Sequence, residues 1–270
     1  MPSPLKNILV INQYFYPDLA STGQYATEIC RGLVSNGRRL KVITAQPCYS
    51  KKSPEAPIQE ENEGLVISRI PMGRFRGREN FRIRIIGYLY FLVKAKGRAK
   101  KFVKDQRVDL VITFHNPPLV ALLGSSIAKK NNIPFIYVLH DVHPDVLLSS
   151  GWKLPSGLIW VWEKLNKKIF ERAKKIIVLS NGMKENLVKG KNVSPDKIEV
   201  IPIWGRPDLL EIEKDLSFKQ ELGIEKDAFI FLYAGNLGVM HPLEIIVDAA
   251  KELNDFPLKI LFVGDGAKRL

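Results

Sequence analysis

A group of histidines and aspartates directly follows one apolar run, residues 134–139, in the sequence. Its members are His140, Asp141, His143 and Asp145. Imidazole and carboxylate side chains can bind sugar hydroxyls, take up a proton or ligate a metal ion. Their spacing is not a standard zinc pattern and no cysteine lies near, so no metal site is predicted. A polar loop that caps the next helix is the alternative. We favour a functional site, because ligands of open α/β sheets bind where strands end, as His140 and Asp141 do.

The turn after the first apolar run, residues 8–12, ends in the small residues Ser21, Thr22 and Gly23. Ser21 or Thr22 can cap the helix that follows, and Gly23 lets a ligand come close to the backbone. Free N–H groups at a helix N-terminus favour phosphate. Taken alone, the segment fits an ordinary capped turn slightly better. It contains no Gly-x-Gly-x-x-Gly, which counts against a dinucleotide-binding dehydrogenase.

Two glycine turns follow apolar runs near the end of the chain. One reads Tyr-Ala-Gly-Asn-Leu-Gly over 233–238, and the other reads Val-Gly-Asp-Gly over 263–266. Glycines allow backbone N–H groups to approach a diphosphate. Either turn alone is a weak signal, but matching places in one βαβ unit make the pair more informative.

Charge is concentrated in one segment of a chain whose formal net charge is +13. Residues 74–107 hold twelve Lys or Arg against two acids, which leaves +10, whereas 208–270 hold seven against twelve, which leaves −5. Basic residues flank the apolar run 85–93, which is too short to span a bilayer. Such a segment can lie in the membrane interface, where each cation near anionic headgroups contributes about 1 kcal/mol.

The residues predicted to contact an anionic inner-leaflet membrane are Arg82, Arg84, Tyr88, Lys94 and Lys96. A buried helix with a solvated basic end is the alternative. Nucleic acid is not predicted as a partner, because no RNP, zinc-finger or clear helix-turn-helix pattern supports it.

Short apolar runs alternate with helical stretches, which predicts an α/β fold with a parallel sheet covered on both faces. A helix is predicted over 22–36 with Gly37 as its C-terminal cap, and 47–62 is predicted to be a loop. The predicted strands of the first part are 8–12, 40–45, 65–71, 108–114, 134–139, 175–180 and 197–202.

The pattern restarts after Pro207, so two units are expected, 1–207 and 208–270. The second contains only a strand over 229–234, a helix over 241–253 and a strand over 258–263. Two strands leave open edges, so we expect the front part of a longer two-domain protein. The alternative is that these strands extend the first sheet.

Two cysteines, Cys30 and Cys48, cannot form a disulfide framework, and they fit a reducing compartment. The first residues show no secretory signal pattern, and no window reaches the roughly 18 apolar residues of a spanning helix. These observations favour a cytoplasmic protein.

Together the motifs resemble the retaining glycosyltransferases of family 4, which have the GT-B fold. The resemblance is greatest to bacterial sugar transferases that build O-antigen, capsule and colanic-acid-like polysaccharides. The matching segments are 16–18, 21–23, 140–145, 178–183, 199–204, 233–238 and 261–266.

The resemblance implies two Rossmann-like domains, with the acceptor on the first and a nucleotide-sugar donor on the second. The acceptor is expected to be a lipid-linked or other saccharide at the inner membrane face, and no metal or cofactor is expected. His140 and Asp141 are the catalytic candidates, and Ser21, Thr22 and His143 the acceptor-binding ones. The donor-binding candidates are Gly23, Gly235, Asn236, Gly238, Gly264, Asp265 and Gly266.

The chain departs from the family pattern in three places. Asn236 and His241 are the nearest candidates where many relatives carry Arg and Lys, and Ile203 stands where relatives often have Asn. The family's paired glutamates, seven residues apart, would lie beyond Leu270, so these 270 residues are expected to be inactive alone. The competing hypotheses are a GT-B sugar-nucleotide epimerase and a non-catalytic protein that binds membranes or polyanions.

Overall fold

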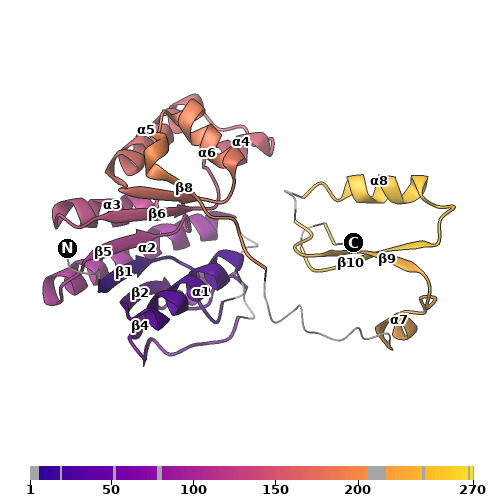
Figure 1. Cartoon of the computed structure of the whole chain (residues 1–270), viewed down its shortest axis with the longest axis horizontal. Coiled ribbons are helices and arrows are strands. Elements are labelled where there is room, and N and C mark those ends of the chain that lie inside the picture. The colour runs from indigo at the N-terminus through magenta and orange to yellow at the C-terminus, as the bar shows by residue number, and fades with distance from the viewer. Residues whose placement is uncertain are drawn as a thin grey trace. The chain divides into compact units, whose positions relative to one another are not determined.

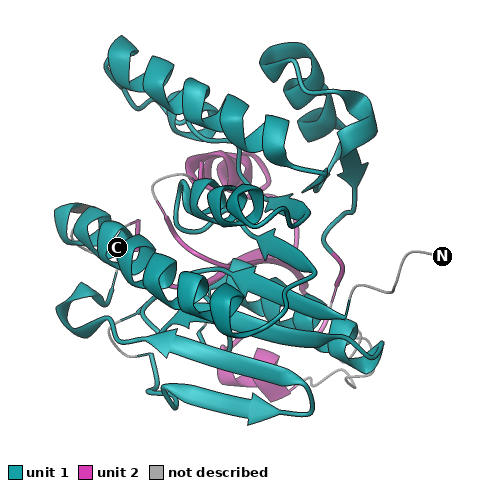
Figure 2. Ribbon diagram, turned by 90° about the vertical axis from the view of Figure 1, so that its left-hand side faces the viewer, with its two compact units in different colours: residues 1–203 teal, residues 204–270 magenta. Residues whose placement is uncertain are grey.

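The computed structural model describes residues 6–18, 20–50, 53–77, 81–205, 217–238, 241–266 and 268–269. The chain divides into two compact units, unit 1 over residues 1–203 and unit 2 over residues 204–270 (Figure 2). The boundary predicted after Pro207 lies in the stretch 206–216, which is outside the described residues.

Unit 1 is built on an eight-stranded sheet in the order β3-β4-β2-β1-β5-β6-β7-β8 (Figure 1). All neighbouring strands run parallel except β3 and β4. The strands are β1 Asn7–Ile11, β2 Arg39–Ala45, β3 Gln59–Asn62, β4 Leu65–Ile70, β5 Leu110–Thr113, β6 Phe135–Leu139, β7 Lys175–Val178 and β8 Ile198–Val200. The seven strands predicted in this part are therefore confirmed, with no end shifted by more than two residues.

Strand β3 was not predicted, because it lies at the end of the segment 47–62 that was expected to be a loop. Its sequence is Gln-Glu-Glu-Asn, and it pairs antiparallel with β4 at the edge of the sheet. An edge strand with a solvated face buries little apolar surface, so a polar sequence suffices there and gives no hydrophobic signal.

Helices cover both faces of this sheet, as predicted. They are α1 Ser21–Ser35, α2 Phe81–Asp105, α3 Val120–Lys130, α4 Asp145–Ser149, α5 Ser156–Arg172 and α6 Asn181–Glu185. Single helical turns occur at Gly73–Phe75, Asn186–Gly190 and Pro195–Lys197.

Successive strand residues point to opposite faces and join two separate clusters of buried side chains. Ile8 and Val10 of β1 pack with Ala26 and Cys30 of α1 on one face. On the other face, the buried cluster takes its helical members from α2, α3 and α5, including Phe91, Val120 and Ile169. The helix α1 therefore lies on the opposite face of the sheet from α2.

The ends of α1 show one correct prediction and one error. Gly37 has a φ of 75°, and its N–H donates to Val34 O while Arg38 N–H donates to Leu33 O. This pattern is a Schellman motif, so the predicted C-terminal cap is confirmed. At the N-terminus Ala20 occupies the cap position without a side-chain hydrogen bond, so neither Ser21 nor Thr22 is the cap.

Unit 2 contains α7 Ser217–Glu221, β9 Phe229–Ala234, α8 Glu244–Glu252 and β10 Leu258–Val263. The strands β9 and β10 pair in parallel and form a sheet of their own. The hypothesis that they extend the first sheet is therefore wrong. No helix among the described residues is both long and apolar enough to cross a bilayer.

The contact between α3 and the sheet depends on a glycine. A Cβ atom on Gly124 would lie 2.3 Å from Cγ2 of Thr113, the last residue of β5, and 3.3 Å from Cε2 of Phe135, the first residue of β6. We expect Gly124→Ala to lower the free energy of unfolding by about 1–3 kcal/mol, because β-branched Thr113 cannot move aside easily.

Gly97 of α2 provides the control, since a Cβ there meets nothing within 4 Å. Gly97→Ala should leave stability unchanged or raise it by about 0.5–1 kcal/mol, because alanine is the better helix former. Urea melts followed by circular dichroism measure both. Equal stability of the two variants would contradict the close contact at Gly124.

Candidate active site at the carboxyl edge of the first sheet

Three loops meet at the carboxyl edge of the sheet in unit 1. The strands β1, β5 and β6 are neighbours in parallel register, so the residues that follow them lie at the same edge. Asn116 Nδ2 donates to Thr22 Oγ1 at 3.1 Å and lies 2.9 Å from Nε2 of His115. His115 Nε2 is 2.9 Å from Oδ2 of Asp141. A continuous chain of polar contacts thus joins the first turn of α1 to the loops after β5 and β6.

His115 and Asn116 were not predicted, although both follow a predicted strand directly. His115 is buried, and its Nδ1 atom has no hydrogen-bond partner among the described residues. With a proton on Nε2 the ring donates to the Asp141 carboxylate, and the approach of Asn116 Nδ2, itself a donor, is then a contact and not a hydrogen bond. A search for polar residues at the end of every predicted strand would have found the pair.

Asp141 is held as a carboxylate with an exposed side chain. The hydrogen bond from His115 is the largest cause that lowers its pKa below the usual value, and burial opposes it. The side chain nevertheless has an exposed fraction of 48%, so a ligand can reach it from solvent. Asp141 can therefore accept hydrogen bonds from hydroxyl groups at neutral pH.

His140 lies beside His115 in partly aromatic surroundings. The two imidazole centroids are 5.1 Å apart, and the rings of Tyr25 and Phe114 contact His140 edge-on at 6.3 and 6.1 Å. Burial, and next the nearby His115, lower the pKa of His140 to about 4 against the opposing effect of Asp141. A neutral imidazole can donate one hydrogen bond and accept another, which suits contact with a sugar hydroxyl.

His143 is placed differently from His140, with its ring stacked on Trp162. Their centroids are 5.9 Å apart at an interplanar angle of 8°, and Asn166 Nδ2 donates to the His143 carbonyl at 2.6 Å. Burial is the main cause of its lowered pKa. A cavity of about 10 Å³ lies among His115, Asp141, His143 and Trp162. Such a volume is about the space of one water molecule, too small for a sugar ring.

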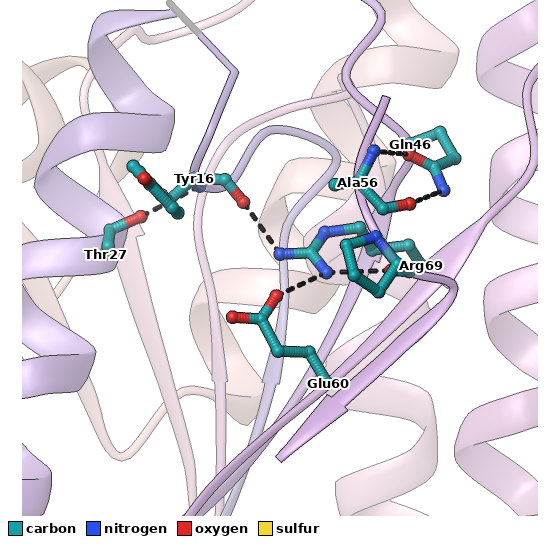
Figure 3. Close-up of polar contacts among 7 residues, drawn as sticks. Tyr16, Thr27, Gln46, Ala56, Glu60 and Arg69 are labelled. Carbon is teal, nitrogen blue, oxygen red and sulfur yellow. Dashed lines mark hydrogen bonds and ion pairs between the residues drawn. The ribbon is translucent and has the colours of Figure 1, made fainter. Parts of the chain in front are cut away.

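The loop between β1 and α1 is held by two buried charged residues. Asp18, with an exposed fraction of 3%, accepts hydrogen bonds from the N–H groups of Cys48 at 2.8 Å and Tyr49 at 3.2 Å. Arg69, fully buried, donates to Tyr16 O at 3.0 Å and pairs with Glu60 at 2.8 Å (Figure 3). Asp18 therefore connects this loop to the segment after β2, and Arg69 connects it to the edge strand β3.

Gly23 has a packing role in α1. A Cβ atom there would lie 3.1 Å from the carbonyl carbon of Tyr14 and 3.2 Å from the nitrogen of Phe15. Its own N–H donates to Ala20 O at 2.8 Å. The absence of a side chain lets α1 lie against the loop, and its predicted contact with donor phosphates stays a prediction. Of its neighbours, Thr22 is buried and Ser21 is exposed.

In unit 2 the two glycine turns lie side by side. Gly235 N–H donates to Val263 O and Leu237 N–H donates to Asp265 O, both at 2.9 Å. A Cβ atom on Gly264 would lie 1.8 Å from Gly235 O, and one on Gly266 would lie 2.4 Å from Leu237 O. The backbones can pass this closely only because both positions are glycine.

Asn236 and His241 also meet in unit 2. His241 Nδ1 lies 2.5 Å from Asn236 O, and Tyr233 Oη donates to the same oxygen at 3.1 Å. Gly238 follows in the same turn, and the N–H of His241 donates to its carbonyl oxygen at 3.0 Å. The donor-binding candidates of unit 2 therefore form one compact group of turns, and the single candidate of unit 1, Gly23, lies in the first turn of α1.

Comparison with known proteins shows the family. The model of Glycosyltransferase Family 4 matches residues 22–203, and the chain belongs to this family. A putative colanic acid biosynthesis glycosyl transferase of Escherichia coli, WcaI, is 24% identical over 96% of this chain and 66% of its own length. The probable glycosyltransferase WbjE of Pseudomonas aeruginosa is 23% identical over 97% of this chain and 64% of its own. The chain thus spans slightly less than two thirds of these relatives.

Solved structures of glycosyltransferases show the same GT-B fold. The sucrose-phosphate synthase of Thermosynechococcus elongatus has a TM-score of 0.67 and 15% identity over 96% of this chain and 62% of its own. Alr3699/HepE of Anabaena was solved in complex with UDP and glucose. It has a TM-score of 0.64 and 15% identity, and the match covers 97% of this chain and 61% of its own. The predicted α/β fold of the GT-B type is confirmed.

The lowered pKa of His140 predicts how stability depends on pH. The unfolded chain takes up a proton on this side chain near pH 6.5, whereas the folded chain does so only near pH 4. Between these values the unfolded state binds more protons, so stability falls as the pH falls. His143 acts in the same direction. We expect His140→Gln to make this fall shallower.

Urea melts at steps from pH 7 to pH 4 measure the slope, and a titration of the histidine Cε1–H resonances measures the pKa directly. The resonance that is lost in His140→Gln should not shift until the pH approaches about 4. A midpoint near 6.5 for that resonance would contradict the buried environment.

Proposed function

We propose that this chain carries the acceptor-binding part, and the first elements of the donor-binding part, of a retaining glycosyltransferase. The donor is a nucleotide-diphosphate sugar and the acceptor a lipid-linked saccharide of a cell-surface polysaccharide. The observation that carries the proposal is the polar chain Thr22–Asn116–His115–Asp141 at the carboxyl edge of a family 4 domain. The names of WcaI and WbjE support sugar transfer, and the UDP complexes of HepE support a nucleotide-sugar donor.

His140 and Asp141 would act on the sugar and the acceptor by position and charge. Asp141 stays ionised and offers an acceptor to hydroxyl groups, and His115 fixes its orientation. Neutral His140 is better suited to hold a hydroxyl group than to act as an acid, because its pKa lies near 4. We assign acceptor contacts to Ser21, Thr22 and His143, which belong to the same three-loop edge or flank it.

The chemistry that the site must assist is the departure of a nucleoside diphosphate. Negative charge grows on the diphosphate as the glycosidic bond breaks, and oriented backbone dipoles in a dry site can stabilise it. We assign this role to Gly23 near the start of α1 and to the paired turns of unit 2, with Gly235, Asn236 and Gly238 on one and Gly264, Asp265 and Gly266 on the other. The departing phosphate can take the proton of the attacking hydroxyl. The mechanism needs no metal or cofactor.

We further propose that α2 rests on an anionic membrane at the cytoplasmic face, where a lipid-linked acceptor would lie. The helix buries Phe91, Ala95 and Ala99 against the sheet. A second stripe faces solvent, in which Leu89 and Val93 are 60% and 70% exposed. Ile85 and Ile86 belong to the same stripe, because residues three or four apart share a helix face.

Cations border this stripe, and more apolar side chains lie on the same side of the sheet. Lys94 and Lys96 are exposed on α2, and Arg82 and Arg84 precede the stripe. Tyr88 is half-buried beside it. The exposed apolar side chains of α4 and α5 and the turn between them are Leu148, Trp152, Leu158, Trp160 and Val161. Tryptophan is enriched at membrane interfaces, and α5 packs on α3, which packs on α2.

Activity tests the assignment of His140. In the full-length enzyme, His140→Ala should lower turnover by about 10²-fold or more, the scale of losing a positioned catalytic hydrogen bond. Release of nucleoside diphosphate in the presence of acceptor measures it. Lys175→Ala, remote from the carboxyl edge at the start of β7, serves as the matched control. Unchanged turnover in His140→Ala would remove His140 from the site.

The reaction products test the class of enzyme. Incubation of the full-length enzyme with donor alone should return the donor unchanged apart from slow hydrolysis. An epimerised donor sugar would instead identify a sugar-nucleotide epimerase and overturn the transferase assignment.

Flotation with liposomes tests the membrane contact. The chain should float with phosphatidylglycerol vesicles at low salt and be released at high salt, since exposed charges are screened. Lys94→Gln combined with Lys96→Gln should weaken binding at least fivefold, because each lysine near the surface contributes about 1 kcal/mol. Leu89→Ser with Val93→Ser should weaken it as well. Lys129→Gln with Lys130→Gln, in the last turn of α3, is the charge-matched control. No binding at low salt would refute the contact.

A further inference from the structure

A groove between α1 and the edge strands β3 and β4 stands apart from the site described above. Its volume is about 300 Å³, which lies at the lower end of the range for small-molecule sites. It lies on the α1 side of the sheet, the face opposite to α2, so the proposed membrane contact leaves it open. The polar chain at the carboxyl edge does not line it.

We propose that this groove binds one sugar unit of an extended, uncharged saccharide acceptor, a subsite beyond the sugar that reacts. The inference rests on the proposed transferase function. Its support comes from the chemistry of the groove walls, from their charge, from their rigidity and from their connection to the candidate active site.

The walls combine an apolar floor with a polar rim. Phe15, Leu65 and Ile67 form apolar surface, while Asn62 and Arg31 contribute polar groups. A sugar ring has an apolar C–H face and a rim of hydroxyl groups that donate and accept hydrogen bonds. Arginine donates, carboxylates accept and asparagine does both, so this rim can satisfy neighbouring hydroxyl groups.

The ring of Tyr16 stands at the groove with an exposed fraction of 52%. The guanidinium of Arg31 lies over it, 5.1 Å from the ring centroid, and makes no ion pair among the described residues. The contact holds Arg31 at the rim with its donors available. An exposed aromatic ring beside the N–H donors of a guanidinium group is suited to a sugar, because a sugar offers C–H groups to the ring and oxygen atoms to the donors.

The charge of the rim argues against an anionic ligand. Among the described residues that line the groove, Glu60 and Glu63 meet one cation, Arg31. The guanidinium of Arg69 pairs with Glu60, and it is fully buried beneath. With Arg69 counted, two carboxylates meet two guanidinium groups, so the groove offers a phosphate no net positive charge, whereas a neutral saccharide would meet acceptors and donors together. A lipid chain is also disfavoured, because it would leave the rim groups desolvated without partners.

The groove is preformed because its two walls are joined. Arg69 donates to Tyr16 O at 3.0 Å on one wall and to Pro57 O at 2.8 Å next to the other, and it pairs with Glu60 of β3 (Figure 3). Gln46 Nε2 donates to Ala56 O at 2.5 Å and Gln46 Oε1 accepts from Ala56 N–H at 3.2 Å. Rigid walls lower the entropy lost when a ligand binds.

One segment connects the groove to the candidate active site. Tyr16 N–H donates to Thr27 Oγ1 at 3.0 Å, and Thr27 Oγ1 donates to Gly23 O at 2.7 Å. Thr22, the neighbour of Gly23, contacts Asn116 of the polar chain. The loop before α1 and the first turns of α1 therefore contribute to both places, and an acceptor of several sugars could contact both.

Saturation-transfer NMR on the chain tests the subsite directly. The probes are methyl glucosides, methyl galactosides and neutral disaccharides of glucose and galactose at millimolar concentration. At least one should receive saturation from the wild-type chain. Tyr16→Ala and Arg31→Ala should each reduce that signal several-fold. Phe218→Ala removes an aromatic ring of similar exposure, 48%, on α7 and should not change it.

Three outcomes would overturn the proposal. They are the absence of saturation transfer to every probe, an equal signal in the groove variants and the control, and displacement of the saccharide by inorganic phosphate, which would indicate an anion site. Thermal melts of each variant separate loss of binding from loss of folding.

Kinetics of the full-length enzyme distinguish this proposal from the proposed function. Arg31→Ala should raise the KM for an acceptor of several sugars several-fold, with the donor KM and the KM for a single-sugar acceptor unchanged. A wild-type enzyme that transfers no sugar would contradict the proposed function but leave the saccharide signal standing. A wild-type enzyme that transfers sugar, with both acceptors affected equally or not at all in Arg31→Ala, would contradict the subsite alone.

Discussion

The burial of two opposite charges beneath the loop between β1 and α1 is the constraint on which the rest of unit 1 depends. A charged group out of water is costly unless it is paired and hydrogen-bonded. Asp18 meets this condition with backbone N–H groups of the segment after β2, and Arg69 with two carbonyl oxygens and Glu60. Because their partners come from different segments, neither charge can be satisfied unless all the segments are in place. The loop therefore has one low-energy position, and the start of α1 takes its position from the loop.

That position explains how a polar chain can form at the carboxyl edge of the sheet. Parallel strands bring the ends of β1, β5 and β6 together, but the contacts among Thr22, Asn116, His115 and Asp141 also require α1 to begin at the right place. The pKa values of Asp141 and His140 are both lowered there, which leaves the first group charged and the second neutral. Asp141 is kept charged mainly by the hydrogen bond from His115, while His140 is kept neutral mainly by burial. An exposed anion and a neutral imidazole side by side are suited to binding hydroxyl groups rather than to binding phosphate.

The two faces of the same sheet carry different chemistry. The basic segment of the chain is a single long helix, α2, which buries small and aromatic side chains on the sheet and leaves an apolar stripe in solvent. The opposite face, under α1, has a groove whose rim is mixed and close to neutral. In our proposal a lipid-linked acceptor would use both faces, with its lipid near the cationic helix and its sugars along the loop before α1. The sheet separates the two environments.

Much of the fold was determined by the sequence alone. Apolar runs alternating with helical stretches predict a parallel sheet covered on both faces, because burial on both sides of a strand selects continuous Val, Ile and Leu. The glycines of the two turns in unit 2 could also be picked out from the sequence, since close backbone contact tolerates no side chain.

Strand β3 could not be predicted, because an edge strand needs little apolar surface. The contact between His115 and Asp141 and the partners of buried Arg69 could not be predicted. Each depends on which distant segments come into contact, and local pattern reports only whether a residue is buried. Which partner satisfies a buried charge is decided by the tertiary structure, where desolvation makes one arrangement far more stable than the others.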